Sequence, residues 1–339
     1  MQAILRAIEY YVPERVLTNT ELAGLYPEWT AARIEKKLGI VERHIAADYE
    51  TAADLGVKAA QCLFASGICQ PAEIDYLLFC TQSPDYFLPT SACVMQTRLG
   101  IPQNAGALDF NLGCSGYIYG LSLAKGLIET DQAKNVLLVT ADTYSKMLHP
   151  QDKSVRTLFG DGAAATLVQG TALPQAAIGP FVMGTDGRGA KNLIVEAGAF
   201  RKRQATNQPV FDENGNPQCD SCLYMNGGEI FTFTLDTVPR VVADLLAKAH
   251  LQMTDIDLFV FHQANQYMLD FLRKKCGIPE DKFAVCLRNF GNTVSSTIPI
   301  ALKNETNAGA LQHGAKVMLV GFGVGYSWGA TIVRWQGDE

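Results

Sequence analysis

The sequence predicts an α/β protein built from two similar halves, each with a mainly parallel sheet that helices cover on both faces. Strand-like apolar runs alternate with helical patterns, and such strands are typical of sheets buried on both sides. The pattern also repeats: residues 73–80 (EIDYLLFC) resemble residues 255–262 (DIDLFVFH), and residues 134–139 (KNVLLV) resemble residues 315–320 (AKVMLV). A repeat period of about 180 residues is too long for a solenoid and indicates two halves related by a pseudo-two-fold axis.

We divide the chain at this repeat into an N-terminal half, residues 1–175, and a C-terminal half, residues 176–339. Hydrophobic residues make up 48% of the chain and charged residues 18%, so the apolar side chains suffice for a large core. The net charge of −6 argues against general nucleic-acid binding. Nine scattered cysteines, a charged N-terminus without a signal-peptide core and the lack of a membrane-spanning apolar run indicate a soluble cytoplasmic protein.

Apolar periodicity and the turn residues at element ends predict the elements of the N-terminal half. For example, Ala and Leu recur at helical spacing over residues 51–66, and Gly100 ends the helix that precedes it. The full set is a strand at residues 4–11, a short helix from Asn19, the helix at 51–66, a strand at 74–81, a helix at 91–99, a strand at 107–110, a helix after Gly116, a strand at 135–140, a turn-rich stretch at 159–165 and a strand at 166–168.

The C-terminal half begins with a long surface loop, predicted over about residues 179–228 because Gly, Asn, Pro and charged residues dominate there. Cys219 and Cys222 lie inside this loop without a second cysteine pair or a histidine at metal-ligand spacing. We interpret them as two unremarkable loop cysteines rather than a zinc site or a redox pair. The elements that follow are a helix at residues 229–250, a strand at 255–262, a helix that ends at Gly277, a strand and a Gly-containing turn up to Asn292, a small-residue helix and a strand at 315–320.

Cys114 lies where a predicted strand passes into a helix, between Gly113 and Gly116. A thiolate there is close to unpaired backbone N–H groups and to the positive end of the helix dipole, which lower its pKa and make it nucleophilic. The flanking glycines let a substrate approach closely. On this segment alone, a small buried hydrophobic residue is an equally good interpretation.

His262 and Asn292 occupy the corresponding strand–helix junctions of the second half. If the two halves face each other, these junctions and that of Cys114 converge on one site. Taken singly, His262 is readily explained as a hydrogen-bonded structural residue and Asn292 as a helix cap. Three such residues at symmetry-related junctions favour a shared functional site.

These segments resemble the Cys–His–Asn triad of 3-oxoacyl-[acyl carrier protein] synthase III, a member of the thiolase superfamily. Cys114 lies in Asn-Leu-Gly-Cys-Ser-Gly-Tyr, His262 in His-Gln-Ala-Asn, and Asn292 in Gly-Asn-Thr-Val-Ser-Ser-Thr-Ile-Pro. The resemblance covers nearly the whole chain, including residues 159–162 and 323–329. It implies a thiolase-like fold of layered αβαβα type, a homodimer without a resident cofactor, and an acyltransferase of fatty acid biosynthesis that uses acyl-coenzyme A and malonyl-acyl carrier protein.

The residue types fit this chemistry. A cysteine thiolate accepts an acyl group from a thioester to give an acyl-enzyme. Asn292 and His262 offer two hydrogen-bond donors to a thioester carbonyl oxygen and thereby stabilise the enolate left when a malonyl thioester loses CO2. The segment 323–325 contains no second reactive cysteine, which favours decarboxylative condensation over thiolysis. Two alternatives remain: acyl transfer to an oxygen or nitrogen nucleophile in a specialised pathway, and a subunit of a heterodimeric synthase.

The resemblance also implies roles for further residues. In the family, the backbone N–H groups of the nucleophile and of a late glycine form an oxyanion hole, and Val324 stands at that glycine position, where its branched side chain narrows the pocket. Leu88 matches the bulky residue that closes the acyl pocket across the dimer, and leucine leaves more room for longer acyl groups. The implied substrate-binding residues are Trp29, Lys37, Lys153 and Arg156 for coenzyme A, Leu88 and Phe231 for the acyl pocket, and Arg273 and Lys274 for carrier-protein docking.

Overall fold

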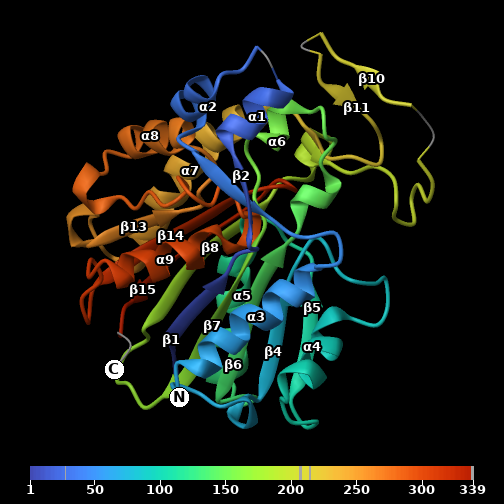
Figure 1. Cartoon of the computed structure of the whole chain (residues 1–339). Coiled ribbons are helices and arrows are strands. Elements are labelled where there is room, and N and C mark those ends of the chain that lie inside the picture. Colours follow the sequence, from blue (N-terminus) through green and yellow to red (C-terminus); the bar gives the residue numbers. More distant parts are fainter. Residues whose placement is uncertain (27, 206–207, 214, 337–339) are drawn as a thin grey trace.

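Two mixed β-sheets lie side by side with helices between and outside them in the computed structural model, which describes residues 1–26, 28–205, 208–213 and 215–336 (Figure 1). The first sheet has the strand order β1-β7-β6-β4-β5, and the second has the order β13-β14-β15-β8. The strands of the first sheet are β1 (Gln2–Tyr11), β4 (Tyr76–Cys80), β5 (Gly106–Phe110), β6 (Asn135–Asp142) and β7 (Gly162–Thr171). Those of the second are β8 (Ile178–Thr185), β13 (Leu258–Phe261), β14 (Lys316–Gly323) and β15 (Ser327–Arg334).

The two sheets have the same arrangement, as the repeat predicts. In the first, β4, β5 and β6 are parallel while β7 and β1 run antiparallel at one side. In the second, β13 and β14 are parallel while β15 and β8 run antiparallel at the corresponding side. The boundary predicted between residues 175 and 176 falls between β7 and β8, and hence between the two sheets.

The expectation of mainly parallel sheets is therefore wrong. Only residues 324–326 separate β14 from β15, and so short a connection forces a hairpin. The apolar strands reflect burial on both faces, which helices impose on antiparallel strands as well as on parallel ones. The strand expected between Gly277 and Asn292 is also missing from the described structure, where one parallel bridge from Phe283 to Phe259 stands at that edge.

Helices make the outer and central layers, in agreement with the predicted αβαβα order (Figure 1). Helix α5 contacts strands of both sheets and buries Tyr117, Ile118 and Leu121 between them, and α9 lies in the same layer. The outer face of the first sheet is covered by α3 (Ala52–Ala65) and α4 (Ser91–Leu99), that of the second by α7 (Gly227–Ala249) and α8 (Gln266–Lys275), and the central layer holds α5 (Gly116–Glu129) and α9 (Thr297–Asn307).

The helix ends follow the local sequence closely. Thr51 caps α3 with its side chain, which accepts a hydrogen bond from the Asp54 N–H, and the Asp54 carboxylate accepts one from the Thr51 N–H. Gly100 ends α4 in the left-handed conformation, with φ of +69°. The helix predicted at residues 229–250 is α7, which His250 ends in the same conformation.

Several short elements lie above the two sheets, at the top of the view in Figure 1. They include the β2–β3 pair and the helices α1, α2 and α6. Their bounds are β2 (Arg15–Thr18), α1 (Asn19–Leu25), α2 (Ala31–Leu38), β3 (Glu42–Ile45) and α6 (Lys153–Arg156). The 3-10 turns are η1 (Pro71–Glu73), η2 (Tyr144–Met147), η3 (Gly187–Asn192), η4 (Met253–Asp255), η5 (Glu280–Lys282) and η6 (Val294–Ser296).

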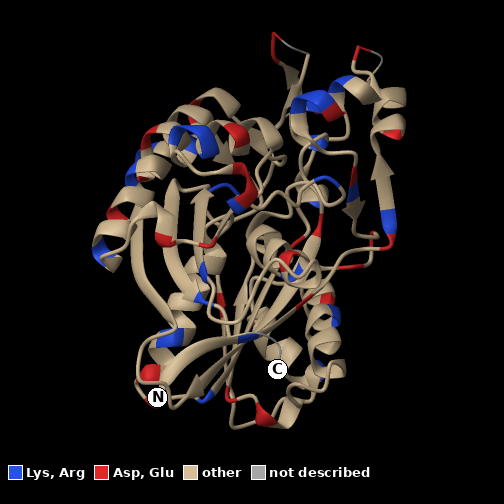
Figure 2. Cartoon of the chain, turned by 90° about the vertical axis from the view of Figure 1, so that its left-hand side faces the viewer, with Lys and Arg blue, Asp and Glu red and all other residues tan. Residues whose placement is uncertain are grey.

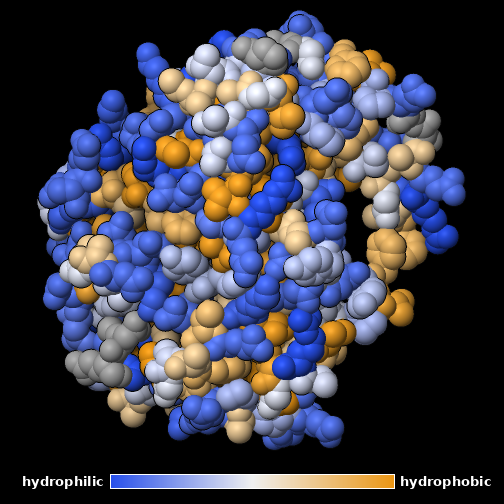
Figure 3. All heavy atoms as spheres, viewed as in Figure 1, coloured by the Kyte–Doolittle hydropathy of each residue, from blue (hydrophilic) through white to orange (hydrophobic). Residues whose placement is uncertain are grey.

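The loop predicted over residues 179–228 has more structure than expected. Its first residues form β8, an edge strand whose Gly and Pro content and partial exposure hide the strand pattern. The rest contains the pairs β9–β12 and β10–β11 and projects from the body at the upper right of Figure 1, and Figure 3 shows an opening beside it. The bounds are β9 (Leu193–Ile194), β10 (Val210–Phe211), β11 (Pro217–Gln218) and β12 (Tyr224–Met225).

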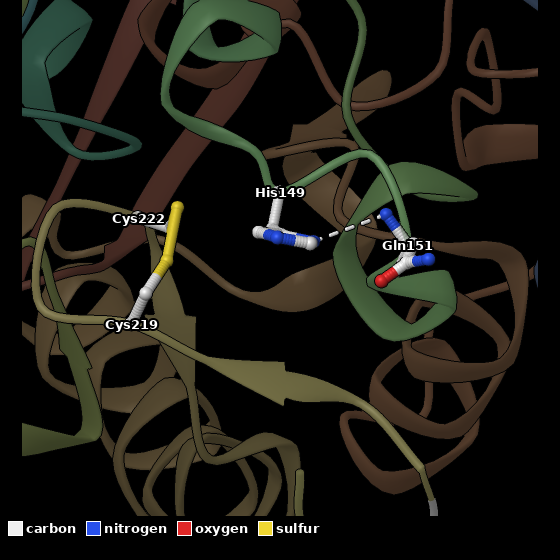
Figure 4. The surroundings of a disulfide bond; sticks show 4 residues. All are labelled: His149, Gln151, Cys219 and Cys222. Atoms are coloured by element: carbon white, nitrogen blue, oxygen red, sulfur yellow. Dashed lines mark hydrogen bonds between the residues drawn. A yellow bond between two sulfur atoms is a disulfide. The ribbon is translucent and has the colours of Figure 1, made fainter. Parts of the chain in front are cut away.

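Cys219 and Cys222 are joined by a disulfide bond between β11 and β12 (Figure 4). The interpretation as two unremarkable loop cysteines is therefore wrong. The turn between them brings their Cα atoms to 5.4 Å, within the range that a disulfide requires.

No helix among the described residues is both long enough and apolar enough to cross a membrane.

Candidate active site

Cys114, His262 and Asn292 line one cavity of about 90 Å³ that opens to solvent. Cys114 follows β5 and precedes α5, and His262 directly follows β13, so both lie at the carboxyl ends of parallel strands. Asn292 comes from the turn before α9. The other residues that line the cavity are Leu158, Phe159, Leu193, Met225, Gly227, Ile230, Ala264, Asn265, Met268, Phe322 and Gly323. The structure thus brings together three residues that are far apart in the sequence.

The Cys114 side chain packs against the end of β14. A Cβ atom added to Gly323 would lie 2.9 Å from the Cys114 sulfur, so this approach requires glycine. The backbone N–H groups of Cys114 and Val324 both lie against the sulfur, where they favour its ionised form. Val324 does not line the cavity; its side chain packs toward Gly113, where an added Cβ atom would lie 2.7 Å from Cγ1. The expectation that Val324 narrows the pocket is not supported.

Burial dominates the ionisation of Cys114. Burial, together with the nearby Asp142 carboxylate, raises the pKa of the thiol to about 12, although the two backbone N–H groups act in the opposite direction. The lowered pKa expected from the helix terminus is therefore wrong for the free protein, because the desolvation of a buried thiolate exceeds the stabilisation from the N–H groups. Asp142 is fully buried and accepts hydrogen bonds from Gln82 N–H (2.7 Å) and the Ser295 hydroxyl (2.6 Å), and burial raises its pKa to about 7.

His262 is neutral in this site because burial lowers the pKa of its imidazole to about 3. Its Nδ1 lies 2.7 Å from the Thr297 hydroxyl oxygen, which is also 3.1 Å from the Val294 carbonyl oxygen. Thr297 has one hydroxyl hydrogen to donate. If the hydroxyl donates to the Val294 carbonyl, Nδ1 donates to Thr297 and Nε2 carries no hydrogen. If the hydroxyl donates to Nδ1 instead, the ring hydrogen is on Nε2, the form that a donor to a thioester oxygen requires.

Asn292 is held by hydrogen bonds on three sides. Its backbone N–H donates to the Leu158 carbonyl (2.9 Å), and its backbone carbonyl accepts from the Gly160 N–H (3.1 Å). Its side-chain Oδ1 accepts from the Val294 N–H (2.9 Å), which forms an Asx turn; Asn292 is not a helix cap, because the N-cap residue of α9 is Ser296. Because this bond occupies Oδ1, the amide NH2 is the edge left for the cavity.

The residues predicted to bind coenzyme A gather outside the cavity around the loop between α1 and α2. The Lys37 ammonium lies over the Trp29 ring, 4.6 Å from its centroid. Lys153 makes an ion pair with Glu28 (2.7 Å), next to Trp29 in the chain. The Arg156 Nε is buried without a hydrogen-bond partner among the described residues. None of the four predicted residues is part of the cavity wall. Trp29 is buried in the core beneath Lys37, and Lys37, Lys153 and Arg156 form a separate cationic patch.

Two predicted pocket residues do not line the cavity. Leu88 is 82% exposed and is not part of the cavity wall. Phe231 stacks on Tyr267 with ring centroids 5.6 Å apart, and its neighbour Ile230 lines the cavity instead. On a helix, adjacent residues point in different directions, so a range of predicted lining residues includes some that face away.

The two predicted docking residues differ. The Arg273 guanidinium donates to the Ile278 carbonyl (3.3 Å) and lies 3.4 Å from the Glu280 carboxylate, so it is used within the chain. Lys274 is exposed at the end of α8. On the face shown in Figure 2, Lys and Arg alternate with Asp and Glu rather than forming one basic patch.

Sequence reasoning missed the residues that support the triad. Thr297 and Ser295 belong to the segment after Asn292, but only the fold shows that they contact His262 and Asp142. Asp142 gave one usable signal, a carboxylate at the end of an otherwise apolar strand.

Comparisons with known proteins agree with this architecture. Residues 108–187 match the family described as 3-oxoacyl-[acyl-carrier-protein (ACP)] synthase III, and residues 246–335 match its C-terminal counterpart. A beta-ketoacyl-[acyl-carrier-protein] synthase III of Clostridium acetobutylicum is 36% identical over 330 residues, which cover 96% of each chain. A synthase III-type protein of Halalkalibacterium halodurans is 37% identical over 337 residues, which cover 98% of this chain and 97% of the relative.

Solved structures give the same result. A 3-oxoacyl-(acyl-carrier-protein) synthase III has a TM-score of 0.98 and 57% identity, covering 99% of this chain and 100% of the other. A 3-oxoacyl-(acyl-carrier protein) synthase from Burkholderia xenovorans has a TM-score of 0.90 and 37% identity, covering 100% of this chain and 95% of the other. The layered fold is that of the ketoacyl synthases, a class of acyltransferases. Within this class, the chain belongs to the 3-oxoacyl-[acyl-carrier-protein] synthase III family.

Proposed function

We propose that this enzyme loads an acyl group from acyl-coenzyme A onto Cys114 and condenses it with malonyl-acyl carrier protein to give a 3-oxoacyl thioester. The observation that carries the proposal is the single cavity lined by Cys114, His262 and Asn292. The main support for the reaction class is the similarity, over nearly their whole length, to proteins named as synthases of this type.

In the first half-reaction the Cys114 sulfur attacks the thioester carbonyl carbon of acyl-coenzyme A. The sulfur–carbon bond to Cys114 forms, the bond to coenzyme A breaks, and the thiol proton leaves with the coenzyme A thiolate. The carbonyl oxygen, negatively charged in the tetrahedral intermediate, is stabilised by the backbone N–H groups of Cys114 and Val324. Because burial raises the pKa of Cys114 to about 12, proton loss accompanies attack rather than preceding it.

In the second half-reaction a malonyl thioester loses CO2 and the electron pair of the broken bond forms an enolate. Nε2–H of His262 and the NH2 group of Asn292 donate to its oxygen. The enolate carbon attacks the acyl carbonyl carbon, a carbon–carbon bond forms, and the Cys114 thiolate leaves and takes up a proton. A thiol with a raised pKa is reprotonated readily, which resets the site.

The cationic patch of Lys37, Lys153 and Arg156 supports coenzyme A as the acyl donor, because ammonium and guanidinium groups pair with phosphates. Stacking of a nucleobase on Trp29 would require Lys37 to move off its ring. Lys274, exposed at the end of α8, remains a candidate contact for an acidic carrier protein. Both half-reactions use protein groups only, so we propose an enzyme without a resident cofactor.

We further propose a cytoplasmic homodimer. Tyr86, Phe87 and Leu88 form an exposed apolar run, and Phe87 contacts Phe200 with ring centroids 5.5 Å apart. Contiguous exposed aromatic and aliphatic side chains mark protein–protein interfaces. Seven free cysteines are compatible with a reducing compartment.

A turnover assay tests the proposed reaction. The protein is incubated with an acyl-coenzyme A and either malonyl-acyl carrier protein or malonyl-coenzyme A, and CO2 and the 3-oxoacyl thioester are quantified. We expect both products in equal amounts with the carrier-bound extender, and no 3-oxoacyl thioester with Cys114→Ala. Acyl transfer to added alcohols or amines without CO2 release would instead support an acyltransferase with oxygen or nitrogen acceptors.

A further inference from the structure

Cys219 and Cys222 differ from the other cysteines of this chain because they are joined in a disulfide bond. All nine cysteines lie in the described residues, and the other seven are free. In a cytoplasmic protein, a disulfide is usually transient and catalytic or redox-sensing rather than structural. Both cysteines are half-buried, so their sulfurs are not sealed in the core.

The turn that carries the disulfide has other contacts that do not depend on it. The Cys222 N–H donates to the Cys219 carbonyl (3.2 Å). Asp220, between them, forms an ion pair with Lys202, and its backbone carbonyl accepts from the Ala197 N–H (2.7 Å). These contacts keep the two cysteines close after reduction, as reversible disulfide exchange requires.

A histidine accompanies the pair. Figure 4 shows the His149 ring beside the disulfide, with its hydrogen bond to Gln151 on the side away from the sulfurs. In that bond Nδ1 accepts from the Gln151 N–H (3.2 Å), so the neutral ring carries its hydrogen on Nε2. The Nε2–H is therefore the ring donor available to a thiolate of the reduced pair, and the thiolate is the nucleophile of exchange.

The disulfide is also linked to the cavity. Leu223, next to Cys222, is buried and its N–H donates to the Met147 carbonyl (2.8 Å). Two residues further on, Met225 of β12 pairs with Leu193 of β9. Met225 and Leu193 both line the cavity that contains Cys114. The disulfide therefore restrains a four-residue turn whose exit strand forms part of the acyl pocket wall.

We propose that Cys219 and Cys222 form a redox-active site whose state sets how tightly the Leu193–Met225 wall holds the acyl group. A dithiol reductant attacks one sulfur, forms a mixed disulfide, and leaves as its own cyclic disulfide. The pair gains two electrons and two protons and becomes two thiols. The reduced turn has one covalent restraint fewer, so the wall yields more readily to longer acyl chains. The effect on acyl selection rests on the proposed function, whereas the redox activity of the pair does not.

The redox activity is tested by labelling. The native protein is treated with dithiothreitol, alkylated with iodoacetamide and mapped by peptide mass spectrometry. We expect Cys219 and Cys222 to be labelled after reduction only, and to become protected again after oxidised glutathione. His149→Gln should slow this reoxidation. A pair labelled equally without dithiothreitol, or never labelled, overturns the proposal.

The link to the pocket is tested by comparing acyl loading. Dithiothreitol is removed by desalting without air. The protein is then incubated with octanoyl or acetyl thioesters, and the amount of each acyl group attached to it is measured by intact mass. Reduction should raise the ratio of octanoyl to acetyl loading on Cys114 about tenfold, the low end of what one methylene group contributes in an apolar pocket. The double variant Cys219→Ser and Cys222→Ser should show the raised ratio in both states, and Cys62→Ser, at an exposed free cysteine, should respond as the unaltered protein does.

Each contrary result has a distinct meaning. If reduction leaves the octanoyl-to-acetyl loading ratio unchanged, the link to the pocket is overturned. If the double variant still responds to reduction, the response belongs to another cysteine. Loading of no acyl group in either state contradicts the proposed function, while the labelling result still decides the redox activity of the pair.

Discussion

Cys114 and His262 occur in this cavity as a neutral thiol and a neutral imidazole, because burial disfavours both charged forms. Asp142 adds a negative charge near the thiol and has no cation in hydrogen-bond contact among the described residues. The nucleophile is thus not stored as a thiolate. Its reactivity depends on a substrate carbonyl reaching the two backbone N–H groups at the sulfur.

The pH dependence of alkylation tests this account of Cys114. Because its pKa is raised to about 12, the thiolate fraction at neutral pH is small and keeps rising with pH well above the range of an ordinary cysteine. We expect Cys114 to react with iodoacetamide more slowly than exposed Cys93 at neutral pH, with a rate still increasing at about pH 10. Peptide mass spectrometry reports both sites in one sample. A rate for Cys114 that levels off near pH 8 contradicts the account.

Asp142→Asn provides the matched comparison. Burial raises the pKa of Asp142 to about 7, so the carboxyl is largely protonated below that pH and charged above it. The variant should therefore react like the unaltered protein below pH 7 and faster above it, since the charge that disfavours the thiolate is absent. Equal rates at high pH would show that Asp142 does not influence the nucleophile.

His262 and Asn292 are expected to act in one half-reaction only. Asn292→Ala should still be acylated on Cys114, but decarboxylation of the malonyl thioester should fall about 10²–10³-fold, the usual cost of one oxyanion donor. Thr297→Val, which removes the hydroxyl that contacts His262 Nδ1, should also slow decarboxylation more than loading. Thr306→Val on the same helix is the control. Equal losses in both half-reactions would assign Asn292 a structural role.

At the scale of elements, local signals predicted the helices well because capping residues and glycines define their ends, as at Thr51 and Gly100. The failures have physical causes. Strand β8 is a half-exposed edge strand interrupted by Gly and Pro, and its pairing with β15 is a long-range contact. The Cys219–Cys222 bond depends on a turn whose geometry no local pattern specified.

The close packing of β14 against the nucleophile predicts the effect of Gly323→Ala. The added methyl group would lie 2.9 Å from the Cys114 sulfur, so it must displace the sulfur or block the approach of an acyl group. We expect a large loss of acyl loading with little loss of helix and sheet content by circular dichroism. Gly126→Ala on α5 is the control, because nothing lies within 4 Å of its Cβ position and loading should be unchanged. Full loading by Gly323→Ala would contradict the packing around Cys114.

At the scale of the whole molecule, the repeat was the most informative feature of the sequence. It predicted two matched sheets and the convergence of Cys114, His262 and Asn292, because equivalent strand–helix junctions meet when the halves pack face to face. The repeat does not predict the supporting contacts of Thr297 and Asp142, because they join residues from elements that have no sequence signal in common. Which side chains line the cavity likewise depended on the orientation of α7.

The exposed run at Leu88 predicts both assembly and acyl preference. Phe87→Asp should weaken the proposed dimer, which sedimentation velocity would detect as monomer at low concentration.

Leu88 leaves more room than an aromatic ring, so butyryl and octanoyl thioesters should load at least as fast as acetyl, and Leu88→Phe should restore discrimination against them. Two or three accommodated methylene groups shift preference about tenfold or more. A strong acetyl preference in the unaltered protein would show that another residue closes the pocket.

The central claim, that Cys114 carries the acyl group, is tested most directly by intact-protein mass spectrometry after incubation with a panel of acyl-coenzyme A thioesters. We predict one acyl group per chain, located by peptide mapping on Cys114 and lost when malonyl-acyl carrier protein is added. Cys114→Ala should fold normally and show no adduct. An adduct of undiminished yield in that variant, or one that maps to another residue, would contradict the account.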